Sequence, residues 1–154
     1  MIVIPNFKTI KIKHIVCDYN GTVAKDGSVL PQIKSLFDKL NQRYTLHVIT
    51  SDTFGSVTDQ LEGYGTEIKI LTSDDHTQEK ADFVSFLGAD TCVCIGNGNN
   101  DREMLRTAAI GIALLGDEGC SKDAMFNSDI VCKNIDEALS LLLEIKRLIA
   151  TLRR

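Results

Sequence analysis

The sequence of 154 residues contains no apolar run near the roughly 20 residues that a membrane-spanning helix requires. It also lacks an excess of positive charge, because 17 lysine and arginine residues stand against 21 aspartate and glutamate residues, a formal net charge of −4. Proteins that grip nucleic acid ordinarily carry a basic surface, so neither a membrane nor a nucleic acid is the expected partner. The segment up to Asp18 lacks the long apolar stretch and small-residue cleavage site of a secretory signal.

The cysteines do not form a disulfide pattern. They number five, and most lie in apolar, strand-like segments: Cys17, Cys92, Cys94 and Cys132. This usage is typical of reduced, buried thiols, and we expect a cytoplasmic protein. Cys92 and Cys94 could share a soft metal, but a core role is favoured because no histidine or further cysteine is close in sequence. With 44% hydrophobic and 25% charged residues and no linker or repeat, residues 1–154 are expected to form a single domain.

What the sequence does contain is a regular alternation of strand-like and helix-like segments. The predicted strands are 10–18, 45–49, 67–71, 91–95, 110–114 and the shorter 130–132, and the predicted helices are 31–41, 54–61, 76–87, a segment after 101, and 136–152. A polar loop with an Asp26-Gly27 turn is expected at 21–30. Short connections between alternating strands and helices predict a doubly wound α/β fold, with a parallel sheet covered on both faces.

Polar residues cluster directly after the predicted strands, where ligands bind in such sheets. They are Asp18 and Asn20, then Thr50, Ser51 and Asp52, then Asn97, Asn100 and Asp101. Asp18 is placed to act as a nucleophile on a tight turn, and Gly21 lets backbone amides approach an anion. Asp18 and Asp101 could together hold a hard cation such as Mg²⁺. Thr50 or Ser51 could bind a phosphoryl oxygen and Lys80 neutralise charge, which completes the groups that phosphoryl transfer requires.

In chain order, DYNGT at 18–22, ITSD at 49–52, Lys80 and GNGNND at 96–101 resemble the four motifs of the haloacid-dehalogenase-like (HAD) hydrolases. The soluble relatives of the P-type ATPase phosphorylation domain, with DKTGT, TGD and GDGxND, are the most similar variety. The resemblance runs from about Ile15 to the C-terminus. It implies a Rossmann-like HAD fold and a Mg²⁺-dependent phosphatase that forms an aspartyl-phosphate on Asp18.

The resemblance also implies a role for each matching residue. The catalytic residues would be Asp18, Asn20, Thr50 and Lys80; the phosphate would be bound by Asp18, Asn20, Gly21, Thr50, Ser51, Lys80 and Asn100; and Mg²⁺ would be held by Asp18, the backbone carbonyl of Asn20, Asn97 and Asp101.

Two positions depart from the family pattern. Most phosphatases of this superfamily have a general-acid Asp at the position of Asn20, and an amide cannot deliver or remove a proton at neutral pH. Loss of such a group typically costs roughly 10²–10⁴-fold in rate. Asn97 replaces a usual Asp ligand, so Mg²⁺ is expected to bind more weakly. The sequence therefore predicts a slow phosphatase, with a catalytically weak or inactive HAD-fold binding or regulatory module as the alternative.

The predicted connections leave no room for a second domain. Only about thirty residues separate Asp18 from Thr50, which excludes the nucleotide-binding domain of an ion pump. Residues 21–30 allow a small flap and residues 72–75 allow nothing, so the protein is expected to lack a cap domain. Its open site would be completed by a neighbouring subunit or a large phosphorylated substrate.

The apolar stripe of 136–152 is wider than one packing face needs, which is compatible with a homo-oligomer. A receiver-type signalling domain is disfavoured, because receivers carry their phosphorylated Asp on the third strand.

Overall fold

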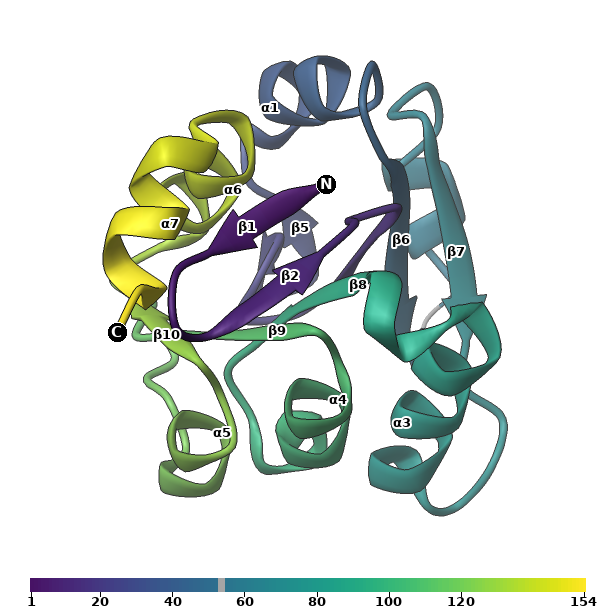
Figure 1. Cartoon of the computed structure of the whole chain (residues 1–154). Coiled ribbons are helices and arrows are strands. Elements are labelled where there is room, and N and C mark those ends of the chain that lie inside the picture. Colours follow the sequence, from purple (N-terminus) through teal and green to yellow (C-terminus); the bar gives the residue numbers. More distant parts are fainter. Residues whose placement is uncertain (53–54) are drawn as a thin grey trace.

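The computed structural model describes residues 1–52 and 55–154. Within these ranges, a sheet of six strands has the order β10-β9-β8-β3-β6-β7 (Figure 1). Every neighbouring pair is parallel. The strands are β3 (His14–Asp18), β6 (Thr45–Thr50), β7 (Thr66–Ile70), β8 (Cys92–Gly96), β9 (Ile110–Leu114) and β10 (Ile130–Cys132). The predicted doubly wound parallel sheet is confirmed.

Helices cover both faces of this sheet, as Figure 1 shows. On one side lie α1 (Ile33–Leu40), α6 (Ile135–Leu143) and α7 (Ile145–Leu152), and on the other lie α3 (His76–Leu87), α4 (Arg102–Thr107) and α5 (Lys122–Phe126). The short helix α2 (Val57–Gln60) links β6 to β7, and two 3₁₀ turns flank β8 at Ala89–Thr91 and Asn99–Asp101. No helix within the described residues is long and apolar enough to cross a membrane.

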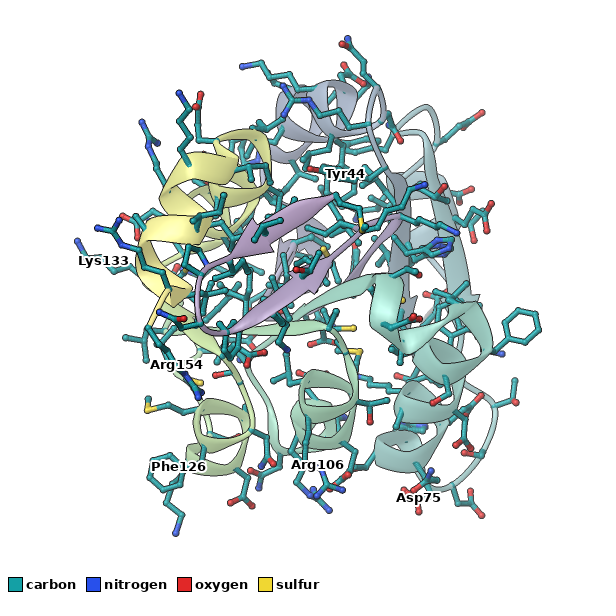
Figure 2. All side chains as sticks on the ribbon, viewed as in Figure 1. Tyr44, Asp75, Arg106, Phe126, Lys133 and Arg154 are labelled. Carbon is teal, nitrogen blue, oxygen red and sulfur yellow. The ribbon has the colours of Figure 1, made fainter. Side chains whose placement is uncertain are left out.

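Strand alternation divides the core between these two helical layers. Ile15 and Cys17 of β3 belong to the cluster under α1, α6 and α7, whereas Val16 belongs to the cluster that faces α3 and α4. Cys92 and Cys94 lie in this second cluster, and the cysteines are all free. The expected reduced, mostly buried thiols are therefore confirmed. Outside the core, Phe126 extends from α5 into solvent (Figure 2).

The predicted strand 10–18 is wrong in its first half. A separate antiparallel hairpin of β1 (Ile2–Ile4) and β2 (Lys8–Ile10) precedes the sheet, and the chain bends across residues 11–13. The amide of Lys13 donates to the carbonyl of Thr91, and its carbonyl accepts from the amide of Thr45. These bonds fix the point at which β3 enters the sheet between β8 and β6.

The expected loop at 21–30 contains a small hairpin of β4 (Ala24–Lys25) and β5 (Ser28–Val29). Asp26 and Gly27 form its turn with φ angles of 50° and 83°, both in the left-handed region that a tight two-residue hairpin turn requires. The predicted Asp-Gly turn is confirmed, and the flap it forms is small.

Two helical predictions need correction. The single helix 136–152 is interrupted at Glu144, whose backbone has left the helical region at φ −111° and ψ 70°, so that α6 and α7 each turn a separate apolar face inward. This break accounts for the wide stripe, because Leu139 of α6 and Leu148 of α7 are both fully buried. The predicted helix 54–61 begins outside the described residues, and of residues 55–61 those of α2 are helical. The helix α5 was not expected.

Candidate active site

The carboxyl ends of the three central strands meet at one cavity. Asp18 is the last residue of β3, Thr50 is the last residue of β6, and Asn97 follows β8 directly. The cavity has a volume of about 270 Å³ and is lined by Asp18, Asn20, Thr50, Ser51, Leu71, His76, Lys80, Asn97, Gly98, Asn100 and Glu118. The structure thus brings together most of the residues predicted for the site. Asp101 lies buried beneath the cavity, and Gly21 lies at its side.

Lys80 links the carboxylates of two different strand ends. Its Nζ donates to Asp18 Oδ1 at 2.9 Å, to Asp101 Oδ1 at 2.7 Å and to Asn100 Oδ1 at 3.3 Å. A lysine on a surface helix usually reaches into water, but Lys80 is only 2% exposed because α3 packs this turn against the sheet. Burial alone would lower the pKa of Lys80, yet the attraction of Asp18 and Asp101 outweighs it and the pKa is raised.

Asp101 organises the loop after β8. Besides the contact with Lys80, its Oδ2 accepts hydrogen bonds from the amides of Asn97 at 3.1 Å and Gly98 at 3.0 Å. A Cβ on Gly96 would stand 2.5 Å from Asp101 Cγ, so only glycine leaves space for this carboxylate. Both oxygens of Asp101 therefore already have partners.

The candidate nucleophile Asp18 is held next to this positive charge. Burial and the neighbouring carboxylate of Asp101 raise its pKa to about 7, against the opposing effect of Lys80. A carboxylate with a raised pKa is a stronger base and nucleophile than an exposed one, provided that it is ionised.

The turn after β3 fixes Asn20 in the flap. Its Oδ1 accepts from the amide of Gly27 at 2.9 Å, across the small hairpin. The amide of Gly21 donates to the carbonyl of Ala24 at 2.8 Å, and Gly21 has a φ of +80°. The side chain of Asn20 therefore stabilises this turn and also lines the cavity.

Thr50 lines the cavity from β6, the strand next to β3. Its side chain is buried, and its Oγ1 accepts from the amide of Asp52 at 3.2 Å. Asp52 adopts a φ of 45°, and its carboxylate accepts from the amide of Val57 at the start of α2. The chain thus turns sharply after β6 and leaves the hydroxyl of Thr50 at the strand end.

The oxygen atoms beside Gly21 suit a hard cation. A Cβ on Gly21 would stand 2.6 Å from Glu118 Oε2, 2.7 Å from Asn97 Nδ2 and 2.8 Å from Asn97 Oδ1, so these side chains close around a space that any larger residue would fill. No group of three or more His, Cys, Asp or Glu side chains gathers as a metal cluster in residues 1–52 and 55–154. A cation here would therefore also take amide and backbone oxygens, which Mg²⁺ accepts.

Sequence reasoning missed Glu118 and did not assign His76 to the site. Glu118 lies in the loop after β9, and the rule that ligands bind beyond strand ends applies to this strand as well. The position of Glu118 in the loop after a predicted strand was therefore visible in the sequence. It was not selected because an acidic residue between glycines is usually solvated.

A second cavity of about 390 Å³ adjoins the first and shares Glu118 with it. It lies between the small hairpin, the loop after β9 and the beginning of α6. Leu30, Leu114 and Ile135 supply apolar surface, and Lys25 and Lys133 supply charge. The two cavities together could accommodate a phosphate group and the molecule that carries it.

Comparisons with known proteins were made for both sequence and fold. No family model matches the chain. An uncharacterized protein of Methanocaldococcus jannaschii is 51% identical over 61 residues, a segment that is 40% of this chain and 66% of that protein.

The structural similarity extends over most of the chain. The 3-deoxy-D-manno-octulosonate 8-phosphate phosphatase of Moraxella catarrhalis, solved with magnesium, phosphate and KDO, matches with a TM-score of 0.71 and 22% identity over 91% of this chain and 92% of its own. A cobalt-bound deoxy-D-mannose-octulosonate 8-phosphate phosphatase of Haemophilus influenzae matches with a TM-score of 0.71 and 14% identity, covering 87% of this chain and 88% of its own. The chain has the HAD-like fold. A phosphoserine phosphatase in its apo form shares this HAD-like fold with a TM-score of 0.64 and 13% identity, over 84% of this chain and 98% of its own.

Proposed function

We propose that the protein is a Mg²⁺-dependent phosphatase that acts through an aspartyl-phosphate on Asp18. The observation that carries this proposal is the contact of 2.9 Å between Lys80 Nζ and Asp18 Oδ1 at the floor of a polar cavity. A buried ammonium next to a carboxylate stabilises the negative charge of a phosphoryl group as it is transferred. The HAD-like fold of known phosphatases supports the same reaction.

In the first step, a carboxylate oxygen of Asp18 attacks the phosphorus of a phosphate monoester. The bond from phosphorus to the ester oxygen breaks, and the leaving alkoxide takes a proton from water. In the second step, a water molecule attacks the phosphorus of the aspartyl-phosphate, releasing inorganic phosphate and regenerating the carboxylate. Lys80 and the hydroxyl of Thr50 would contact the phosphoryl oxygens throughout, with Ser51 and Asn100 at the edge of the same cavity.

When bound, Mg²⁺ would neutralise charge between Asp18 and the phosphoryl group. Asp18, the backbone carbonyl of Asn20 and Asn97 are the proposed donors. Asp101 would join them only if Lys80 gave up its contact with Oδ1, since the other oxygen accepts two backbone amides. Asp101 would otherwise act by holding Lys80 and the loop.

The proposed turnover is slow. Asn20 has no proton to exchange at neutral pH, and its amide oxygen is already bonded to Gly27. Both protonation of the leaving group and activation of water would then depend on solvent. This same observation favours a second candidate function, a regulatory or binding module in which the phosphorylated or unphosphorylated site recognises a partner rather than turning over substrate.

The proposed substrate is a phosphorylated small molecule or macromolecule whose leaving group occupies the adjoining cavity of about 390 Å³. The small flap of β4 and β5 cannot close over the site by itself, so we infer that a homo-oligomer contact or the substrate completes it. Free, buried cysteines favour a reducing compartment such as the cytoplasm.

The test is hydrolysis of an activated aryl phosphate with and without Mg²⁺, with Asp18→Asn measured beside the wild type. The proposal expects metal-dependent turnover that Asp18→Asn abolishes. Full activity in Asp18→Asn would contradict the mechanism. If the wild type is inactive, incubation with acetyl phosphate and mass spectrometry separates the two candidate functions, because a stable adduct on Asp18 favours the regulatory module.

A further inference from the structure

Two side-chain oxygen atoms lie beside Gly21. Glu118 Oε2 and Asn97 Oδ1 stand 2.6 and 2.8 Å from the point that a Cβ on Gly21 would occupy, with Asn97 Nδ2 at 2.7 Å, and the backbone carbonyl of Asn20 directly precedes the same glycine. These atoms come from three separate loops, after β3, β8 and β9. Such a convergence of oxygens is the arrangement that a hard divalent cation requires.

Hydrogen bonds fix the loop that carries Glu118 directly to Asn97. Asn97 Nδ2 donates to the carbonyl of Gly119 at 3.1 Å, and the carbonyl of Asn97 accepts from the amide of Ser121 at 2.8 Å. The amide nitrogen, although it also lies beside Gly21, is thus used for the loop, and the amide oxygen is the atom of Asn97 that can bind a cation. An aspartate at this position would lose the bond to Gly119 and place two carboxylates side by side.

The charges of the cavity indicate what Glu118 contributes. Among the described residues, Asp18 and Glu118 are the two carboxylates that line it, since Asp101 lies beneath with both oxygens occupied. Asn97 is neutral. Within the described part of the chain, Glu118 has neither a hydrogen bond nor an ion pair, although Lys25 pairs with the adjacent Asp117. Its carboxylate is free to bind a cation.

We propose that Glu118 is a ligand of the divalent cation at this site and supplies the second carboxylate that Asn97 does not. This inference rests on the proposed function, because it concerns the same Mg²⁺ site. The loop after β9 thereby becomes a part of the metal site, and the amide of Asn97 serves both to hold that loop and to donate its oxygen.

The test is direct measurement of cation affinity by titration calorimetry with Mg²⁺ and by electron paramagnetic resonance with Mn²⁺ as the probe. Glu118→Gln removes the charge without changing the size of the side chain. Asp117→Asn is the matched control, because this exposed neighbour lines the adjoining cavity and not the first one. We expect Glu118→Gln to weaken Mn²⁺ binding about tenfold or more, and Asp117→Asn to leave it within about twofold.

Measurement at low and high KCl separates ligation from a general effect of charge, because screening removes the second but not the first. Equal affinity in Glu118→Gln and wild type, or an equal loss in Asp117→Asn, would overturn the assignment of Glu118 while leaving the metal-dependent phosphatase intact. Absence of Mn²⁺ binding by the wild type would overturn both. If Asp18→Asn retained both Mn²⁺ binding and full phosphatase activity, the proposed mechanism alone would be overturned.

Discussion

At the scale of single residues, Lys80 carries the positive charge that joins the two carboxylates of the site. It is 2% exposed, and the two carboxylates it contacts come from β3 and from the loop after β8. Buried ion pairs contribute little net stability compared with apolar side chains, but removing one partner leaves an unpaired buried charge. Lys80 therefore supports the fold of the loop as well as the proposed chemistry.

Lys80→Met is expected to lower the free energy of unfolding at pH 8 by about 3–5 kcal/mol, because Asp18 and Asp101 would face each other without a counter-charge. The loss should shrink at pH 5, where Asp18, whose pKa is raised to about 7, can take up a proton. Urea unfolding at both pH values measures it, with Lys69→Met as control, since Lys69 is partly exposed and lies 3.9 Å from Glu79. Equal effects of the two substitutions would contradict the role given to Lys80.

Gly21 and Gly27 provide a matched pair of substitutions. Both have nearly the same φ, +80° and +83°, but a Cβ on Gly21 would collide with Asn97 and Glu118 whereas nothing lies within 4 Å of one on Gly27. Each change to alanine should cost about 1–2 kcal/mol of stability through backbone strain. Only Gly21→Ala should also impair Mn²⁺ binding and turnover. Similar Mn²⁺ affinity in the two variants would show that the space beside Gly21 does not hold the cation.

The candidate residues could be predicted to different degrees. Asp18, Thr50 and Asn97 follow apolar strands, so the topology alone brings them together. Lys80 was selected by its order among the motifs, because no local pattern distinguishes a buried helical lysine from a solvated one. Glu118 follows β9, so the rule of strand ends applied to it, but its proximity to Gly21 could not be predicted because it depends on tertiary contacts such as the hydrogen bond between Asn97 and Gly119.

At the scale of elements, β3 and β6 are joined by more than their backbone ladder. His14 Nδ1 and His47 Nε2 lie 3.0 Å apart, so one ring donates to the other. The pKa of His14 is lowered by burial and by Lys13, and that of His47 by burial and by His14; Glu67 opposes both shifts. A pair of this kind is stable only while at least one ring is neutral.

The sign of the resulting pH dependence follows from these lowered pKa values. As the pH falls, the unfolded chain takes up protons near pH 6.5, before the folded chain does. The stabilisation by the neutral histidine pair is therefore fully present above about pH 6.5, and it is lost as the pH falls through the lower pKa values of the folded state. Asp18, whose pKa is raised, contributes a slope of opposite sign in the range from about 4 to 7. The histidine effect is therefore isolated by comparing variants rather than from the wild type alone.

Between pH 7 and pH 5, wild type is expected to lose more stability than His47→Gln, by up to about 1.4 kcal/mol per pH unit for each proton taken up on unfolding. Urea midpoints across this range measure the difference. His76→Gln, which lies outside the pair, is the control for removal of a histidine. Parallel curves for wild type and His47→Gln would show that the pair does not titrate with unfolding.

The elements that sequence patterns located best are those with uninterrupted apolar segments, such as β9 and β10. The sequence patterns failed to locate elements whose ends are determined by tertiary contacts. The apolar residues of α6 and α7 continue through Glu144 without a proline or glycine, so nothing local marks the break. The hairpin of β1 and β2 likewise depends on packing against α7 and on the bond from the amide of Arg154 to the carbonyl of Pro5.

At the scale of the whole molecule, the candidate site lies at the carboxyl ends of the strands, whereas the apolar core lies along the two faces of the sheet. The strands β3, β6 and β8 are buried along most of their length, so polar groups can be placed beyond their ends without disturbing the packing. This separation explains why the fold could be predicted from apolar periodicity, although the site departs at Asn20 and Asn97 from the motifs of the HAD hydrolases that the sequence resembles. Ligands that bind to these polar groups in the folded state should therefore stabilise it against unfolding.

That coupling predicts a cooperative stabilisation by Mg²⁺ and inorganic phosphate. Asp18 and Glu118 repel an anion, so phosphate should bind well only after a cation has neutralised them. At concentrations about 100-fold above the dissociation constant, binding to the folded state adds about 2.7 kcal/mol, which should raise the melting temperature by about 5–10 °C for a chain of this length. Thermal denaturation with Mg²⁺, phosphate, both, or KCl of equal ionic strength measures it. We expect the shift with both ligands to exceed the sum of the separate shifts. A merely additive shift, or one that KCl reproduces, would mean that the cation and the phosphate do not share this cavity.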